Sequence, residues 1–148
     1  MERQMQLDGT DWKIINILRE AHVPNNAIAK ALNLSEGAIR QRLKKLKDSG
    51  VMVVRGLINP DILEGQQIAL IAVTVAESAL LESKAAEIAE LENVQSVNLT
   101  TGRYDLMVEI LVDSNKGLVR FLTEQLSQVA GVSSTESFLV LKGYNKYI

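Results

Sequence analysis

Five polar side chains in the first third of the sequence are suited to binding a polyanion. Arg40, Lys44 and Lys47 recur at helical spacing, so they would line one stripe of a helix. Gln41 and Lys45 lie on the neighbouring stripe. Cations neutralise phosphates, and Arg, Lys and Gln side chains donate hydrogen bonds to base edges. The chemistry that this pattern indicates is the binding of double-stranded DNA.

Position along the helix separates base-reading residues from phosphate-binding ones. Recognition helices read bases mainly from their N-terminal part, and helix N-termini favour phosphates. A basic helix face alone is more often simply solvated, but here the cap, the turn and the charge distribution coincide with it. The predicted base readers are Glu36, Gly37, Arg40 and Gln41. The predicted phosphate ligands are Lys44, Lys45, Lys47, Asn25 and Asn26, and Ser35 at the helix start completes the candidate set.

A helix-turn-helix would position these side chains. Three helices are predicted: 11–21 with Thr10 as cap, one ending at Leu32 with Asn25 or Asn26 as cap, and one capped by Ser35 that ends at Ser49. Only Asn33-Leu34-Ser35 separates the last two, which is the spacing of a helix-turn-helix. Residues 51–58 are typical of a short β-ribbon.

The rest of the chain predicts a different architecture. After Asn59-Pro60-Asp61, apolar runs and helical stripes follow in the order βαββαβ, which is the ferredoxin-like arrangement. The expected strands are 68–76, 94–101, 104–112 and 132–141, and the expected helices are 79–91 and 116–129. Because several strands are apolar on both faces, a second copy of the sheet is expected to cover one face and form a homodimer.

The predicted fold class is therefore α+β, with two domains. A helix-turn-helix (winged-helix-like) DNA-binding domain with its ribbon would span residues 1–58. A linker would span 59–67, and a ferredoxin-like dimerisation domain 68–148.

Charge and composition restrict the classes of function. The 148 residues carry a net charge of −2, but residues 1–58 carry ten Lys/Arg and six Asp/Glu, so only the second part is acidic. The chain has no cysteine and one histidine, and it has no phosphate-binding glycine loop and no metal-ligand spacing. We therefore expect neither an enzyme nor a cofactor. No apolar stretch reaches the ~20 residues of a membrane span, and residues 1–6 lack a signal-peptide core, which predicts a cytoplasmic protein without a membrane partner.

Both parts of the chain together resemble one family. The motifs are Leu7-Asp8 with Ile14-Ile15 and Leu18, Ile28-Ala29 with Leu32-Asn33-Leu34-Ser35, the run 39–46 with Gly50-Val51, the segment 101–105, and 131–137 leading into Val140-Leu141-Lys142. This pattern resembles the Lrp/AsnC (leucine-responsive, asparagine-synthase or feast/famine) transcriptional regulators. The resemblance implies homodimers formed through the C-terminal domains, assembly into octamers, and an amino-acid effector bound between dimers.

The resemblance also implies an effector site. Gly102, Arg103, Tyr104 and Asp105 would form the binding loop, and Thr135 and Ser137 would face it from the last strand. Turn amides can hold a carboxylate, and Asp105 can hold an ammonium group. The alternative for residues 102–105 is a purely structural hairpin turn. The corresponding alternative function is a DNA-organising architectural protein without an effector.

Overall fold

The computed structural model describes residues 6–148, which form two compact units, the second being Leu57–Ile148. Residues 1–5, which the sequence analysis places at the start of the DNA-binding domain, lie outside the described part. Within the described residues, no helix combines the length and apolar character needed to cross a membrane.

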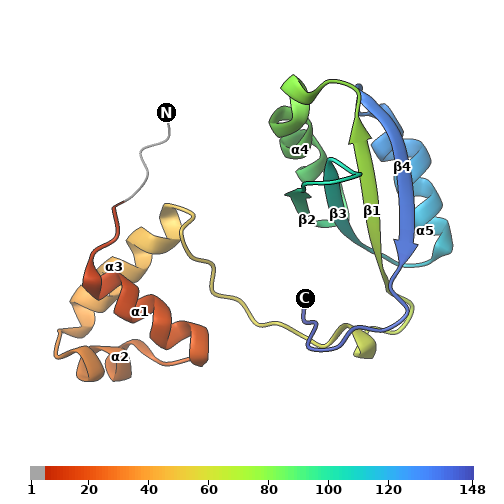
Figure 1. Ribbon diagram of the computed structural model, residues 1–148. Helices are drawn as coiled ribbons and strands as arrows, with labels where there is room; N and C mark the ends of the chain where they lie inside the picture. Colours follow the sequence, from red (N-terminus) through yellow and green to blue (C-terminus); the bar gives the residue numbers. More distant parts are fainter. Residues whose placement is uncertain (1–5) are drawn as a thin grey trace. The chain divides into compact units, whose positions relative to one another are not determined.

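The first unit consists of three α-helices around a small apolar core (Figure 1). They are α1 (Gly9–Glu20), α2 (Asn25–Leu32) and α3 (Glu36–Asp48). Each helix turns an apolar stripe inward, so Ile14, Ile28 and Ile39 are fully buried together. This shared core fixes α3 against α1 and α2 and leaves its polar stripes in solvent.

Helix capping differs in part from the sequence prediction. Ser35 caps α3 as predicted, because its hydroxyl accepts the Ala38 N–H at 3.1 Å. Thr10 does not cap α1: the cap is Asp8, which forms a capping box with Asp11. Neither predicted asparagine caps α2, because the cap position is Pro24, which offers no side-chain acceptor.

The predicted β-ribbon over 51–58 is wrong for the single chain. The structure has no strand there, although its apolar side chains include Val53 and Leu57, which are exposed. A strand needs a neighbouring strand that exchanges backbone hydrogen bonds with it. Within residues 6–148, only Ile58 of this segment exchanges a reciprocal pair of such bonds, of 2.9 and 3.1 Å with Ile148, while the Met52 N–H donates to the Leu46 carbonyl at the end of α3. The predicted linker 59–67 contains a single turn of 3₁₀-helix, Pro60–Ile62, and the strand β1 (Gln67–Val75) begins at its last residue.

The second unit is a four-stranded antiparallel sheet in the order β2-β3-β1-β4, which is the ferredoxin-like order. Helices α4 and α5 cover one face (Figure 1). The elements are β1 (Gln67–Val75), α4 (Leu81–Ala89), β2 (Val94–Leu99), β3 (Leu106–Val112), α5 (Asn115–Arg120) and β4 (Val132–Leu139).

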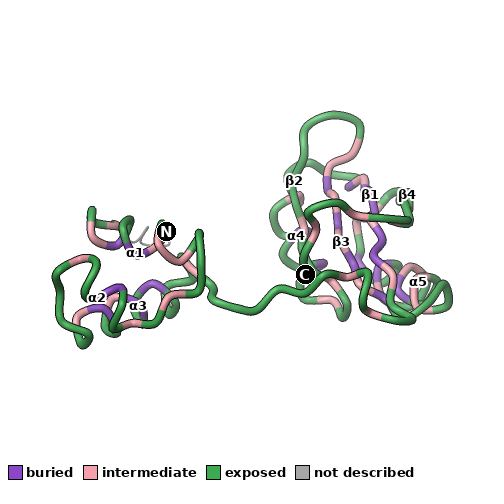
Figure 2. Tube along the Cα trace, turned by 90° about the horizontal axis from the view of Figure 1, so that it is seen from below, coloured by how far each residue is buried: buried purple, intermediate pink, exposed green. Residues whose placement is uncertain are grey.

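The two faces of this sheet differ in what covers them. Alternate residues of β1 and β3, such as Ile71 and Val108, are fully buried against the helices, as the purple strand segments of Figure 2 show. The opposite face, called here the open face, carries half-buried Leu70 and Met107 and the partly exposed Phe138. Among the described residues of this unit, no helix lies on the open face.

The predicted helix 116–129 is interrupted. After α5 the chain forms a π-turn (Phe121–Gln125) and then a 3₁₀ turn (Leu126–Gln128). Hydroxyls of Thr123 and Ser127 donate to carbonyls four residues earlier, and such back-bonding competes with regular helix geometry.

Candidate nucleic-acid interface and effector loop

The turn between α2 and α3 is held by left-handed backbone at Asn33, with φ of 54°. Asparagine tolerates this conformation better than most residues. The Leu34 N–H then donates to the Ala29 carbonyl at 2.9 Å, and Ser35 caps the next helix. The short turn therefore sets the angle at which α3 leaves α2.

Almost all predicted DNA ligands are exposed on this unit. Asn25 is half-buried, while Asn26, Ser35, Glu36, Gly37, Arg40, Gln41, Lys44, Lys45 and Lys47 are exposed. The fold brings the α3 residues onto one solvent-facing side because Ile39, Leu43 and Leu46 occupy the buried side. The side chains are thus free to meet a large partner.

Two of the cations are paired within α3. Arg40 Nη2 lies 2.9 Å from Glu36 Oε1, and Lys44 contacts Asp48. The hydrogen bond from Lys44 to Asp48 raises the pKa of the lysine above its ordinary value, so it stays charged. Because 70% of the Arg40 side chain and 76% of the Lys44 side chain are exposed, these pairs are worth little, and a phosphate or base can replace them.

Arg42 lies beside these cations but points into the protein. Its guanidinium donates to Asp8 and to Asp11 at 2.7 Å each, and Asp11 is 3% exposed. Hydrogen bonds from the Asp11 backbone N–H and from Arg42 lower the pKa of the Asp8 carboxyl. The bridge ties the start of α1 to the middle of the recognition helix, so Arg42 positions α3.

Hydrogen bonds between its own residues hold the segment 100–105 in a compact turn. The Thr100 hydroxyl donates to the Tyr104 carbonyl at 2.7 Å, and Gly102 has a φ of 116°, which favours glycine. One carboxylate oxygen of Asp105 accepts the Val75 N–H at 2.8 Å. Asp105 thus fastens the loop to the end of β1, and its other carboxylate oxygen could still accept a bond from a ligand.

The loop reaches β4 through a residue that the sequence analysis missed. The Tyr104 hydroxyl contacts the carboxylate of Glu136, and Arg103 stacks 5.4 Å from the Tyr104 ring centroid. Glu136 lies inside the motif 131–137, but only the pairing of β4 with β1 shows that it comes within reach of residue 104.

Thr135 and Ser137 alternate with Glu136 along β4. In register they pair with Val73 and Ile71, whose side chains face the helices, and both are exposed. Thr135 lines a cavity of about 210 Å³ together with residues of the 122–133 segment. Within one chain, then, Glu136 and not Thr135 or Ser137 contacts the loop.

The fold and these two sites define a class of protein: a helix-turn-helix domain joined to a ferredoxin-like domain that carries a hydrogen-bonded loop at residues 100–105. Residues 7–51 match a winged helix-turn-helix DNA-binding domain. Residues 68–147 match the Lrp/AsnC ligand binding domain. The chain belongs to the Lrp/AsnC family and is a DNA-binding transcriptional regulator, not an enzyme.

Individual relatives agree over nearly the whole chain. The HTH-type transcriptional regulator FL11 of Pyrococcus abyssi is 32% identical over 145 residues, covering 97% of this chain and 95% of that protein. The leucine-responsive regulatory protein of Haemophilus influenzae is 28% identical over 145 residues, covering 95% and 87%. A transcriptional regulator of Neisseria meningitidis, solved as a complex with L-Met, superimposes with a TM-score of 0.67 at 26% identity over 93% of this chain and 91% of that one.

Proposed function

We propose that this regulator reads DNA through the N-terminal half of α3. The residues that contact bases are Glu36, Gly37, Arg40 and Gln41. The residues that contact phosphates are Lys44, Lys45 and Lys47 of α3, with Asn25 and Asn26 at the start of α2 and Ser35, the N-cap of α3. The observation that carries this assignment is the exposed polar side of α3, opposite the buried Ile39, Leu43 and Leu46. No acidic side chain other than Glu36 and Asp48 lies on this helix, and both are already paired with its cations.

Two alanine variants test this division of roles. Arg40→Ala should weaken operator binding and relax preference at one base position by about 1–3 kcal/mol. Lys44→Ala should weaken binding to all sequences alike and reduce the slope of affinity against salt by about one. The measurement is fluorescence anisotropy over a set of single-base operator variants at several salt concentrations. Equal loss of selectivity in both variants would contradict the assignment.

We further propose that the C-terminal domain binds an amino acid or a related small molecule at residues 102–105, with Thr135 and Ser137 supplied across an assembly contact. The relative solved with L-Met supports this effector class. Titration calorimetry against the twenty amino acids tests it. Saturable binding that Arg103→Ala weakens supports the proposal, and heats at the blank level for all twenty contradict it.

One observation favours a second candidate, an architectural protein without an effector. Two polar side chains of the loop already have partners within the chain: Asp105 accepts a hydrogen bond from the Val75 N–H, and the Tyr104 hydroxyl contacts Glu136. In that case the loop is a structural turn, and DNA compaction should proceed equally with and without every amino acid.

The proposed assembly is a homodimer that pairs the open faces of two sheets, with octamers formed from such dimers. The support is the partly apolar open face, which includes Leu70, Met107 and Phe138. We propose that the regulator acts in the cytoplasm, where it would meet its DNA. Light scattering at several protein concentrations, with and without amino acids, measures the mass of the assembly in solution and so tests the proposed homodimer and octamer.

A further inference from the structure

A cavity of about 480 Å³ lies in the second unit, at the end of the sheet where β1 begins and β3 ends. Three chain segments build it: 60–68, 111–115 and 140–146. Its volume falls in the range of small-molecule sites. Measured along β1, it lies about 25 Å from the loop 102–105, which is fastened to Val75.

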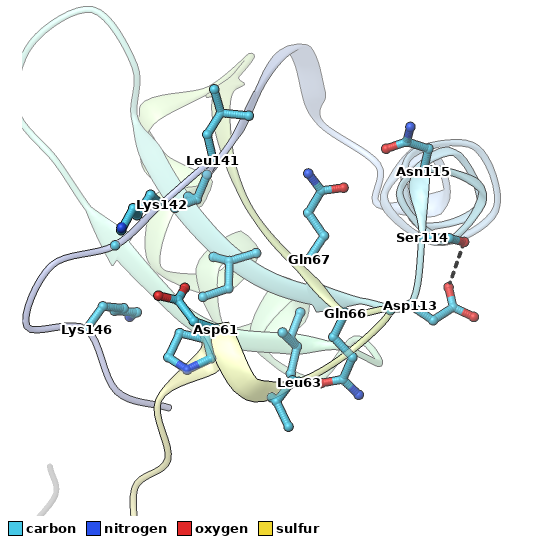
Figure 3. A pocket seen from close by; sticks show the side chains of 16 residues that line it. Asp61, Leu63, Gln66, Gln67, Asp113, Ser114, Asn115, Leu141, Lys142 and Lys146 are labelled. Atoms are coloured by element: carbon cyan, nitrogen blue, oxygen red, sulfur yellow. Dashed lines mark hydrogen bonds between the residues drawn. The ribbon is translucent and has the colours of Figure 1, made fainter.

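Opposite charges meet in this cavity, and two of the charged groups form no ion pair, although Lys142 Nζ lies 5.4 Å from the centroid of the Tyr144 ring. Lys146 is already bound to Glu109 at 2.7 Å, and Asp113 accepts from the Ser114 hydroxyl and points outward (Figure 3). Asp61 and Lys142 form no ion pair with any residue in the 6–148 range. They leave one anionic and one cationic group available on the cavity wall.

Neutral groups complete the lining. Gln67 lies between the charged side formed by Asp61 and Lys142 and the opposite side formed by Asn115 (Figure 3). Its amide can donate and accept hydrogen bonds. Ile68, buried at the start of β1, gives the cavity an apolar part.

We propose that this cavity binds a small zwitterion, with the ammonium group on Asp61, the carboxylate on Lys142 and a polar end against the amides of Gln67 and Asn115. A free anion would meet Asp61 and a free cation would meet Lys142, so only a molecule carrying both charges satisfies the two groups together. The site is separate from the proposed effector loop and does not rest on it.

Titration calorimetry on the full chain tests the site, with L-glutamine as the probe because its amide end matches the neutral groups. Saturable binding is expected to weaken at least tenfold in Asp61→Asn and in Lys142→Gln, since each removes one charge-assisted contact. N-acetyl-L-glutamine, which lacks the ammonium group, should bind at least tenfold more weakly than L-glutamine. Glu124→Gln and Lys116→Gln, exposed groups outside the cavity, are the matched controls and should bind like the parent chain.

The remaining outcomes separate this site from the effector loop. Binding that is lost in Arg103→Ala but kept in Asp61→Asn would place the ligand at the loop and overturn the inference, while supporting the proposed effector. Absence of saturable binding in the parent chain would also overturn it. A change of mass in Asp61→Asn or Lys142→Gln by light scattering, without ligand binding, would make the cavity a contact between copies and overturn it as well.

Discussion

The guanidinium of Arg42 and the carboxylates of Asp8 and Asp11 form a bridge between two helices, with both contacts at 2.7 Å. Arg40 and Lys44, on the same helix, pair only with neighbours one turn away. Residues of the same charge on one helix thus have different tasks: Arg42 holds α3 in place, and its neighbours are available to DNA.

Arg42→Ala should destabilise the N-terminal unit by about 2–3 kcal/mol, because it leaves the buried Asp11 carboxylate without its cationic partner, with only the Asp8 N–H still bound to it. This loss of stability is smaller than that expected for a fully buried ion pair, because 34% of the Arg42 side chain is exposed. Urea unfolding followed by the fluorescence of Trp12 measures it. Arg40→Ala, which breaks only an exposed pair, is the control and should change stability by less than about 1 kcal/mol. Similar losses in both variants would contradict the positioning role.

Acid should weaken the same region through Asp8. The Asp11 backbone N–H and the Arg42 guanidinium hold the pKa of the Asp8 carboxyl below its ordinary 3.8. A lowered pKa stabilises the fold above the unfolded value, and this contribution is lost as the pH falls through the folded value. Asp8→Asn retains an N-cap acceptor but not the charge. It should therefore be less stable than the parent near neutral pH, and the difference should shrink as the pH falls below 3.8. Urea unfolding across this pH range is the measurement, and a constant difference would contradict it.

At the scale of elements, the α2–α3 turn determines how the recognition helix is presented. Asn33 adopts the left-handed conformation that reverses the chain, and Ser35 satisfies a backbone donor of α3. The first residues of α3, which are the predicted base readers, begin directly after this cap.

Ser35→Ala should destabilise the N-terminal unit by about 1 kcal/mol, through loss of the cap. Ser35→Asp keeps an acceptor and favours the helix dipole, so stability should be retained. If Ser35 lies against a phosphate, the aspartate should nevertheless weaken DNA binding. Thermal unfolding and anisotropy measured on both variants separate the two effects. Undiminished DNA affinity in Ser35→Asp would remove Ser35 from the interface.

At the scale of the whole molecule, the open face of the sheet is the proposed surface of self-association. Phe138 is 43% exposed and pairs in register with Leu70 on that face. The Lys146–Glu109 ion pair, in which Glu109 is the cross-strand partner of Leu70, brings the C-terminal segment to the same face.

Phe138→Asp should convert the expected dimer into a monomer, because two copies would bring uncompensated charge into an apolar contact. Light scattering measures the mass, and circular dichroism checks that the domain remains folded. Val119→Asp is the matched control, because Val119 is 58% exposed on α5 and lies away from the open face. The mass of this variant in solution should equal that of the parent protein. A dimeric Phe138→Asp variant would contradict pairing through the open face.

The sequence by itself was enough to predict the three N-terminal helices, the βαββαβ order and the exposed polar side of α3. These features depend on local periodicity, on Ser35 as a cap and on glycines at turns. Such signals involve only residues that are close together in the sequence.

Only the tertiary structure decided which charged groups are paired and which segments find partners. Arg42 meets Asp8 across 34 positions and Tyr104 meets Glu136 across 32, so packing and strand register, not spacing, bring them together. The same reason explains the absence of the predicted ribbon over 51–58. Its composition favours a strand, but a strand forms only where another segment exchanges backbone hydrogen bonds with it, and in the described part of the chain the one reciprocal exchange is between Ile58 and Ile148.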